Sequence, residues 1–91
     1  MEITEVKLTL RNEEKLKGFA NITLDNAFVI RGLKIINGSK GLFISMPSKR
    51  RSDGTFQDIA HPINPETRKM IEEVVLNAYN TEMNTATKQK N

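Results

Sequence analysis

Apolar and polar residues alternate with a period of two through most of the first two thirds of the chain. The alternation covers residues 5–10 and 15–24, and two further apolar runs follow at 28–36 and 42–46. A period of two is typical of strands that bury one face. The run at 28–36 is nearly continuous and rich in β-branched residues, so it predicts a central strand covered on both faces. Polar or glycine-containing segments, such as Asp25-Asn26, separate the runs and predict antiparallel connections.

A short hairpin is predicted after the fourth strand. Pro47 cannot donate a ladder hydrogen bond, so it marks the end of that strand. Asp53 and Gly54 form a dipeptide that favours a tight type I′ turn and folds the chain back on itself. With a two-residue loop, Lys49 would lie opposite Asp58. The sequence therefore predicts an extended arm between the fourth strand and the C-terminal segment.

The hydrophobic period changes after Ile63, where a helix is predicted to begin. Asn64 is a good N-cap, Pro65 suits the first helical position, and Glu66 is favourable in the first turn. An apolar stripe then recurs at helical spacing and indicates an amphipathic helix that reaches about Tyr79. Its members are Met70, Ile71, Val74, Val75 and Ala78.

These elements predict an α+β fold: a small antiparallel β-sheet with a projecting basic hairpin and one C-terminal amphipathic helix. A chain of 91 residues and 10.3 kDa has room for one domain. We assign that domain to residues 1–80 and interpret residues 81–91 as a polar flexible tail. A domain of this size buries only roughly 60 to 65% of its unfolded surface. We therefore expect a symmetric homodimer, built by strand or helix exchange.

Composition excludes several classes of site. The chain has no cysteine, which rules out disulfides, thiolate zinc sites and cysteine nucleophiles. Fourteen basic and eleven acidic residues give a net charge of +3, which permits a nucleic-acid partner without requiring one. The N-terminus does not resemble a signal peptide, and no apolar run approaches the roughly 18 residues of a membrane span. We expect a cytoplasmic protein with no membrane partner.

The tightest cluster of positive charge is the triplet Lys49, Arg50 and Arg51. A projecting ribbon that carries cations can enter a major groove or lie along a phosphate backbone. The alternative interpretation is a solvated loop that protects a strand edge from aggregation, and the residues alone favour neither. Lys40 and Arg31 are weaker candidates at the rim of such an interface.

His61 is the sole histidine, and with Asp58 three positions earlier it could form half of an acid–base or metal site. A lone histidine with no further ligand nearby is more often structural. Catalysis generally needs a nucleophile or a second acid positioned by the fold. We therefore predict no catalytic residue, no metal site and no cofactor. Asp58, His61 and Asn64 are instead expected to tie the hairpin to the start of the helix through hydrogen bonds.

The chain has few aromatic residues, so its four phenylalanines are expected to pack in the core. The alternative is that some of them stack on bases, provided that they lie exposed beside cations. Phe56 is the first candidate for that role, because it lies close to the predicted tight turn. The four are Phe19, Phe28, Phe43 and Phe56.

Several contiguous motifs resemble one known family. The most specific are Met46-Pro47-Ser48-Lys49-Arg50, then Asp53-Gly54, then Asp58-Ile59-Ala60-His61-Pro62-Ile63-Asn64. Ile22-Thr23-Leu24-Asp25, Phe28-Val29-Ile30 and Gly41-Leu42-Phe43-Ile44 precede them. Over residues 1–80 the chain closely resembles the SpoVG (stage V sporulation protein G) family.

The resemblance implies a bacterial cytoplasmic protein linked to septation, cell division and sporulation. It implies a dimer that binds DNA and RNA as a regulator, with basic residues at positions 49–51 contacting the nucleic acid. Our leading hypothesis is therefore a non-enzymatic nucleic-acid-binding regulator. A second hypothesis is a module that engages division or regulatory proteins, in which the basic triplet only confers solubility. A small enzyme ranks last, because few residues are available for a catalytic constellation.

Overall fold

The computed structural model describes the backbone of residues 1–90 and the side chains of residues 1–84. Four strands form an antiparallel sheet in chain order, and two shorter strands form a separate hairpin. One helix follows them. The elements are β1 (Ile3–Leu10), β2 (Leu16–Leu24), β3 (Phe28–Gly38), β4 (Gly41–Ser45), β5 (Ser48–Arg50), β6 (Phe56–Asp58) and α1 (Pro65–Lys90).

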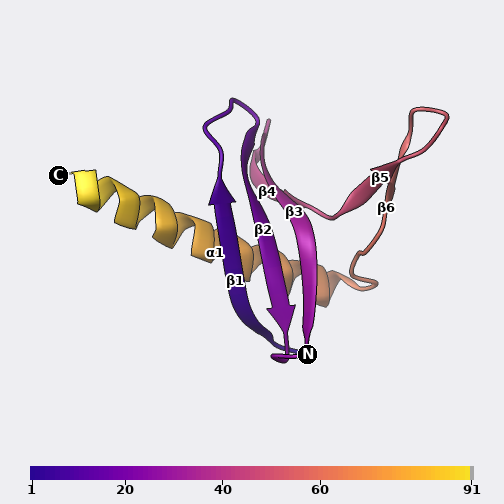
Figure 1. Ribbon diagram of the computed structural model, residues 1–91, viewed down its shortest axis with the longest axis horizontal. Coiled ribbons are helices and arrows are strands. Elements are labelled where there is room, and N and C mark those ends of the chain that lie inside the picture. The colour runs from indigo at the N-terminus through magenta and orange to yellow at the C-terminus, as the bar shows by residue number, and fades with distance from the viewer. Residues whose placement is uncertain (91) are drawn as a thin grey trace.

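The helix lies across one face of the four-stranded sheet and extends past β1 (Figure 1). It contacts β1 and β4, the two edge strands. The core fills the space between helix and sheet and consists of Ala20, Ile22, Leu33, Ile35, Ile44, Met46, Ile71, Val75 and Tyr79. We call the opposite side of the sheet the open face, because none of the described elements packs against it (Figure 1).

The prediction that the strand over 28–36 is covered on both faces is wrong. Leu33 and Ile35 are fully buried on the helix side, whereas Lys34 between them is exposed. Val29 lies on the open face and is 48% exposed. A single helix can cover only one face of a sheet, so a continuous apolar run does not ensure burial on both.

The turn between β2 and β3 uses Asp25 and Asn26, which both adopt positive φ angles of 51° and 52°. The Ala27 N–H donates to the Leu24 carbonyl at 2.9 Å and closes the turn. Aspartate and asparagine tolerate this left-handed region better than other side chains. The turn predicted at this dipeptide is therefore confirmed.

The predicted start of the helix is confirmed. The Asn64 side-chain oxygen accepts a hydrogen bond from the Thr67 N–H at 2.8 Å, and Pro65 occupies the first helical position. This cap satisfies one of the amide groups that a helix N-terminus leaves without an internal partner. Ile71 and Val75 then bury one stripe against the sheet.

The predicted end of the helix near Tyr79 is wrong, because α1 continues to Lys90. Among residues 1–84, whose side chains the structure describes, Tyr79 is the last buried one, and residues 80–84 are all exposed. No glycine or proline stands after Pro65 to end the helix. Loss of the apolar stripe therefore marks the end of packing rather than the end of the helix. The flexibility assigned to residues 81–91 stays a prediction.

Within residues 1–90, no helix combines the length and apolar character needed to cross a membrane.

The one-sided core predicts unequal effects of substitution along β3. Ile35→Ala removes a fully buried side chain and should lower the free energy of unfolding by about 2–5 kcal/mol. Val29→Ala on the open face should cost less than about 1 kcal/mol. Urea denaturation followed by circular dichroism measures both values. An equal loss of unfolding free energy in the two variants would show that the open face is covered.

Candidate nucleic-acid interface

Residues 48–58 form a hairpin, here called the arm, that projects from the sheet (Figure 1). Its two strands pair antiparallel, with Lys49 opposite Gln57 and Arg50 opposite Phe56. At its base, the Ile59 N–H donates to the Pro47 carbonyl at 2.7 Å. The predicted hairpin is therefore present, and backbone hydrogen bonds hold its two sides together.

The loop of the arm differs from the predicted two-residue turn. The Arg51 N–H donates to the Thr55 carbonyl at 2.7 Å, and the Gly54 N–H donates to the Arg51 carbonyl at 3.0 Å. Three residues therefore form the loop, with Gly54 at a φ of 91°. A type I′ turn would also need positive φ at Asp53, which does not adopt it. The longer loop shifts the register by one, so Lys49 does not face Asp58.

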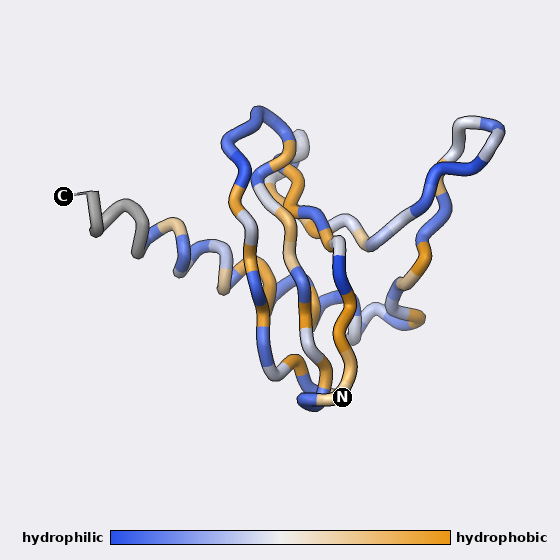
Figure 2. The backbone as a smooth tube through the Cα atoms, viewed as in Figure 1, coloured by the Kyte–Doolittle hydropathy of each residue, from blue (hydrophilic) through white to orange (hydrophobic). Residues whose placement is uncertain are grey.

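Alternation along the arm divides the basic triplet between its two faces. Lys49 and Arg51 share one face, where the Arg51 Nε donates to the Gln57 side-chain oxygen at 3.2 Å. Arg50 lies on the other face beside Phe56. The first strand and the loop of the arm form a hydrophilic projection (Figure 2). Positive charge is therefore presented in two directions.

The three cations of the arm are exposed and unneutralised. Among the described side chains, the only ion pair within 4.0 Å joins Lys69 and Glu73 on α1, at 3.9 Å. Asp53 and Asp58 therefore form no ion pair with the triplet, although both belong to the arm. Phosphate groups would meet these cations without first displacing a carboxylate.

Arg31 and Lys40, the two weaker candidates for nucleic-acid binding, lie in different parts of the structure. Arg31 is an exposed residue of β3, next to Gly32 and close to the base of the arm, since a Cβ on Gly32 would lie 4.0 Å from Pro47. Lys40 is exposed in the turn between β3 and β4, a separate projection of the sheet (Figure 1). Of the two, Arg31 is the one close to the base of the arm, and a binding role for either residue stays a prediction.

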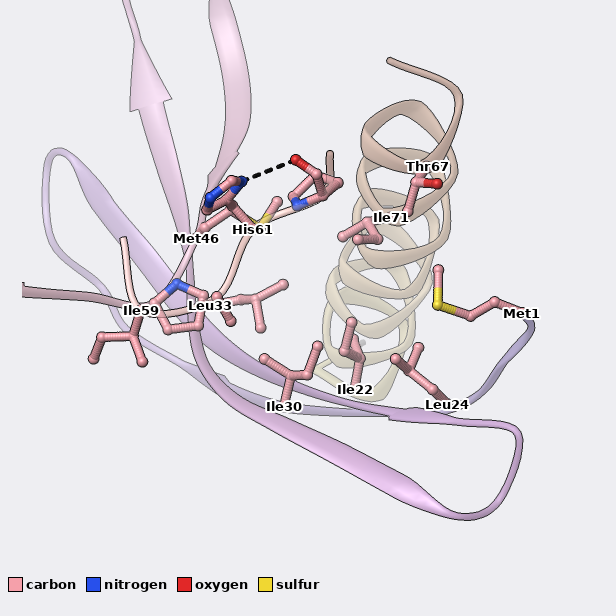
Figure 3. Close-up of a pocket in the computed structure, with 13 residues that line it drawn as sticks. Met1, Ile22, Leu24, Ile30, Leu33, Met46, Ile59, His61, Thr67 and Ile71 are labelled. Carbon is pink, nitrogen blue, oxygen red and sulfur yellow. Dashed lines mark hydrogen bonds between the residues drawn. The ribbon is translucent and has the colours of Figure 1, made fainter. Parts of the chain in front are cut away.

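His61 lies at an apolar hollow of about 340 Å³ between the sheet and the start of α1 (Figure 3). Its Nδ1 atom is 3.0 Å from the Pro62 carbonyl. The lining is apolar apart from His61 and Thr67 and includes no carboxylate. Among the described residues, no three histidine, aspartate or glutamate side chains gather as metal ligands.

The expected hydrogen bonds between the hairpin and the helix are not found among the described residues. His61 contacts the next residue, and Asn64 caps its own helix. The prediction that Asp58, His61 and Asn64 tie these elements together is therefore wrong. His61 and Asn64 make only local hydrogen bonds, and no side-chain hydrogen bond of Asp58 is found among the described residues.

The expectation that the phenylalanines fill the core is also wrong. Phe19 is half-buried, and Phe28, Phe43 and Phe56 are 66%, 45% and 70% exposed. Aliphatic residues and one tyrosine occupy the space beneath the helix instead. For Phe19 the sequence does contain a signal, because alternation over residues 15–24 places it on the same face as Lys17, Asn21 and Thr23.

Comparison with known proteins completes the description. The SpoVG family model matches residues 1–81. The chain belongs to the SpoVG family. A relative from Bdellovibrio bacteriovorus named "Putative septation protein SpoVG" is 57% identical over 83 residues, which cover 91% of this chain and 77% of the relative. A relative of the same name from Anaeromyxobacter sp. (strain Fw109-5) is 59% identical, and the match covers 91% of this chain and 86% of the relative. Another from Phytoplasma australiense is 45% identical, and the match covers 99% of this chain and 95% of the relative.

The SpoVG match extends over the whole sheet and the arm, and it ends within α1 shortly after Tyr79. The last buried residue of the helix therefore lies just inside the matched region. The exposed residues 82–84 of α1 lie beyond it.

The loop of this SpoVG-family arm contains one perturbed carboxyl group. Hydrogen bonds from the Thr55 hydroxyl and N–H hold the pKa of Asp53 below its ordinary value of 3.8. A lowered folded-state pKa means that the carboxylate stabilises the loop above pH 3.8, and that this stabilisation is lost as the pH falls through the folded-state pKa. At neutral pH Asp53 is therefore ionised and keeps both hydrogen bonds from Thr55.

Removal of the Thr55 hydroxyl should raise the pKa of Asp53 toward its ordinary value, because that hydroxyl makes the largest contribution to the shift. A carbon-detected NMR titration of the Asp53 carboxyl in Thr55→Val measures this change. Thr55→Ser keeps the hydroxyl and should keep the low pKa. An unchanged titration midpoint in Thr55→Val would contradict the assignment.

Proposed function

We propose that this protein is a non-enzymatic regulator that binds DNA or RNA through the arm. The observation that carries the proposal is the exposure of Lys49, Arg50 and Arg51 on a projecting hairpin without an acidic partner. A two-stranded ribbon fits a major groove or follows a phosphate backbone. Arginine also contacts phosphates through its planar fork. Phosphate contacts supply affinity and fix the register of the protein on the nucleic acid, while limited base contacts add preference.

The biological setting follows from the relatives. Their printed name links them to septation, and we propose the same setting for this chain, together with a role in cell division and sporulation control in the bacterial cytoplasm. A regulator that binds nucleic acid needs no catalytic constellation. The proposal therefore requires neither a cofactor nor a metal.

We further propose that the protein acts as a homodimer. Three large apolar side chains lie exposed on or just after the arm, namely Phe56, Ile59 and Ile63, and Ile63 is 89% exposed. Such a string favours contact with another protein surface. A twofold axis would double the number of arms and bring six cations to one ligand.

Charge reversal on the arm should weaken binding and lower its salt dependence. Six phosphate contacts in a dimer predict a slope of log K against log salt of about −5. Lys49→Glu combined with Arg50→Glu leaves two of these cations per dimer, so the slope should become shallower and change from about −5 to about −2. Fluorescence anisotropy with duplex DNA at several salt concentrations measures both values.

A matched control is available on α1. Arg68→Glu combined with Lys69→Glu makes the same change of net charge on two exposed residues of the helix. Its slope and affinity should change far less than those of the arm variant. Equal losses in the two variants would show that net charge alone, rather than the arm, governs binding.

The alternative is a module that engages division or regulatory proteins, and the same exposed apolar string favours it. Capture of a protein partner that survives nuclease and high salt would support this alternative. Retention of that partner by the arm variant would assign the contact to the apolar residues rather than to the cations.

The proposed dimer predicts that a charge at Ile63 disrupts self-association. Ile63→Glu should raise the dimer Kd by at least about 100-fold, because each of the two copies loses about 1.5 kcal/mol or more of apolar burial. Analytical ultracentrifugation measures the change, with Met83→Glu on α1 as the control. A monomer at all concentrations of the unmodified protein would exclude the dimer.

A further inference from the structure

The open face of the sheet carries two of the phenylalanines that the core leaves out. Register places Phe19 on β2 with Lys34 of β3 beside it, and Phe43 on β4 with Ile36 of β3 beside it. Burying a phenylalanine is worth about 1.5–3 kcal/mol. Phe43 is 45% exposed and Phe19 is half-buried, so both rings forgo part of the stability that a covering element would supply.

The two rings lie within reach of a single extended ligand. They stand on β2 and β4, which are separated by β3. Strands lie about 4.8 Å apart, so the two positions are about 10 Å apart across the sheet. A Cβ at Gly38 would lie 2.9 Å from the Phe43 ring, so that ring rests against glycine backbone at one edge of the face.

Cations lie around Phe19 on this face. The Arg11 guanidinium lies over the Phe19 ring at 5.5 Å from its centroid. Lys34 on β3 is paired with Phe19. On β1, Thr9 is paired with Phe19, and Lys7 lies two residues before Thr9 on the same face. Glu5 is the acidic residue of β1 on this face.

Acidic residues also occur near the rim. Glu13 and Glu14 lie in the loop between β1 and β2, and Glu14 lines a hollow beside Phe43 together with Lys15. Neither forms an ion pair within 4.0 Å among the described side chains. The positive groups of the strands are therefore available to an anionic ligand.

Aromatic rings interleaved with cations favour single-stranded nucleic acid over a protein partner. Unpaired bases stack on aromatic side chains and on arginine planes, while the backbone follows positive charge. A protein interface would bury Lys7 and Lys34 without partners, and lysine is depleted in such interfaces. A duplex keeps its bases stacked inside and cannot use the rings.

We propose that the open face binds the unpaired bases of single-stranded nucleic acid, with Phe19 and Phe43 as stacking residues. Arg11 and Lys34 hold the adjoining phosphates. Arg31 lies on β3 close to the base of the arm, so it provides positive charge between the two surfaces. This inference rests on the proposed function and adds to it a second contact surface and a class of ligand.

The test compares leucine variants of the exposed phenylalanines. Phe43→Leu keeps apolar bulk but removes the aromatic ring, as does Phe19→Leu. Phe28→Leu is the matched control, because alternation along β3 places this exposed phenylalanine on the helix side of the sheet. Fluorescence anisotropy with labelled oligo-dT, oligo-U and a blunt DNA duplex measures affinity.

Each stacking variant should lose roughly 5- to 150-fold in affinity for the single strands, with duplex affinity unchanged. Phe43→Trp should retain binding, because it keeps a ring at the same position. A loss of affinity for both oligo-dT and oligo-U supports stacking on the bases of DNA and RNA alike. A loss of affinity for oligo-U alone supports RNA as the ligand. Thermal melting checks the fold, and Phe43→Leu carries the test alone if Phe19→Leu destabilises the sheet.

Unchanged single-strand affinity in Phe43→Leu, with binding still weakened by Lys49→Glu combined with Arg50→Glu, would overturn the open-face site and leave the arm in place. A change of oligomeric state in Phe43→Leu without a change in affinity would instead identify the face as a contact between copies. Absence of any binding by the unmodified protein would overturn both proposals.

Discussion

One helix lying on a four-stranded sheet is the constraint on which the structure depends. Ile71 and Val75 bury the helix against one face of the sheet, and the core contains only nine buried residues. Because α1 covers one side, every side chain that alternates to the other side stays in contact with solvent. The open face is the consequence of a sheet that the described elements cover on one side only.

Local signals in the sequence predicted the elements well. Period-two alternation located the strands, and Asn64 followed by Pro65 located the start of α1, because capping and alternation depend on neighbouring residues. The Asp53-Gly54 dipeptide located the arm, but it suits both a two-residue loop and the three-residue loop that forms. The difference depends on φ at Asp53, which the residue type alone does not determine.

Non-local features were predicted less well, for a physical reason. Burial on one or both faces of β3 depends on how many layers the whole chain provides, and the alternation of a single strand does not contain that information. The phenylalanines were assigned to the core on their hydrophobicity, yet Tyr79 and aliphatic residues fill it. The candidate site was located because Lys49, Arg50 and Arg51 adjoin a turn signal. The grouping of Phe19 with Phe43 required the register of three strands.

The two proposed surfaces would use different interactions and would respond differently to salt. Cations on the arm release counterions from phosphates, so their contribution to affinity falls steeply as ionic strength rises. Stacking on Phe19 and Phe43 displaces water rather than ions, so its contribution persists at high salt. On these proposals, the arm would attract any nucleic acid at a distance, whereas the open face would distinguish unpaired bases from a duplex at contact. A protein with both surfaces therefore gains preference for single strands as salt increases, although its total affinity declines.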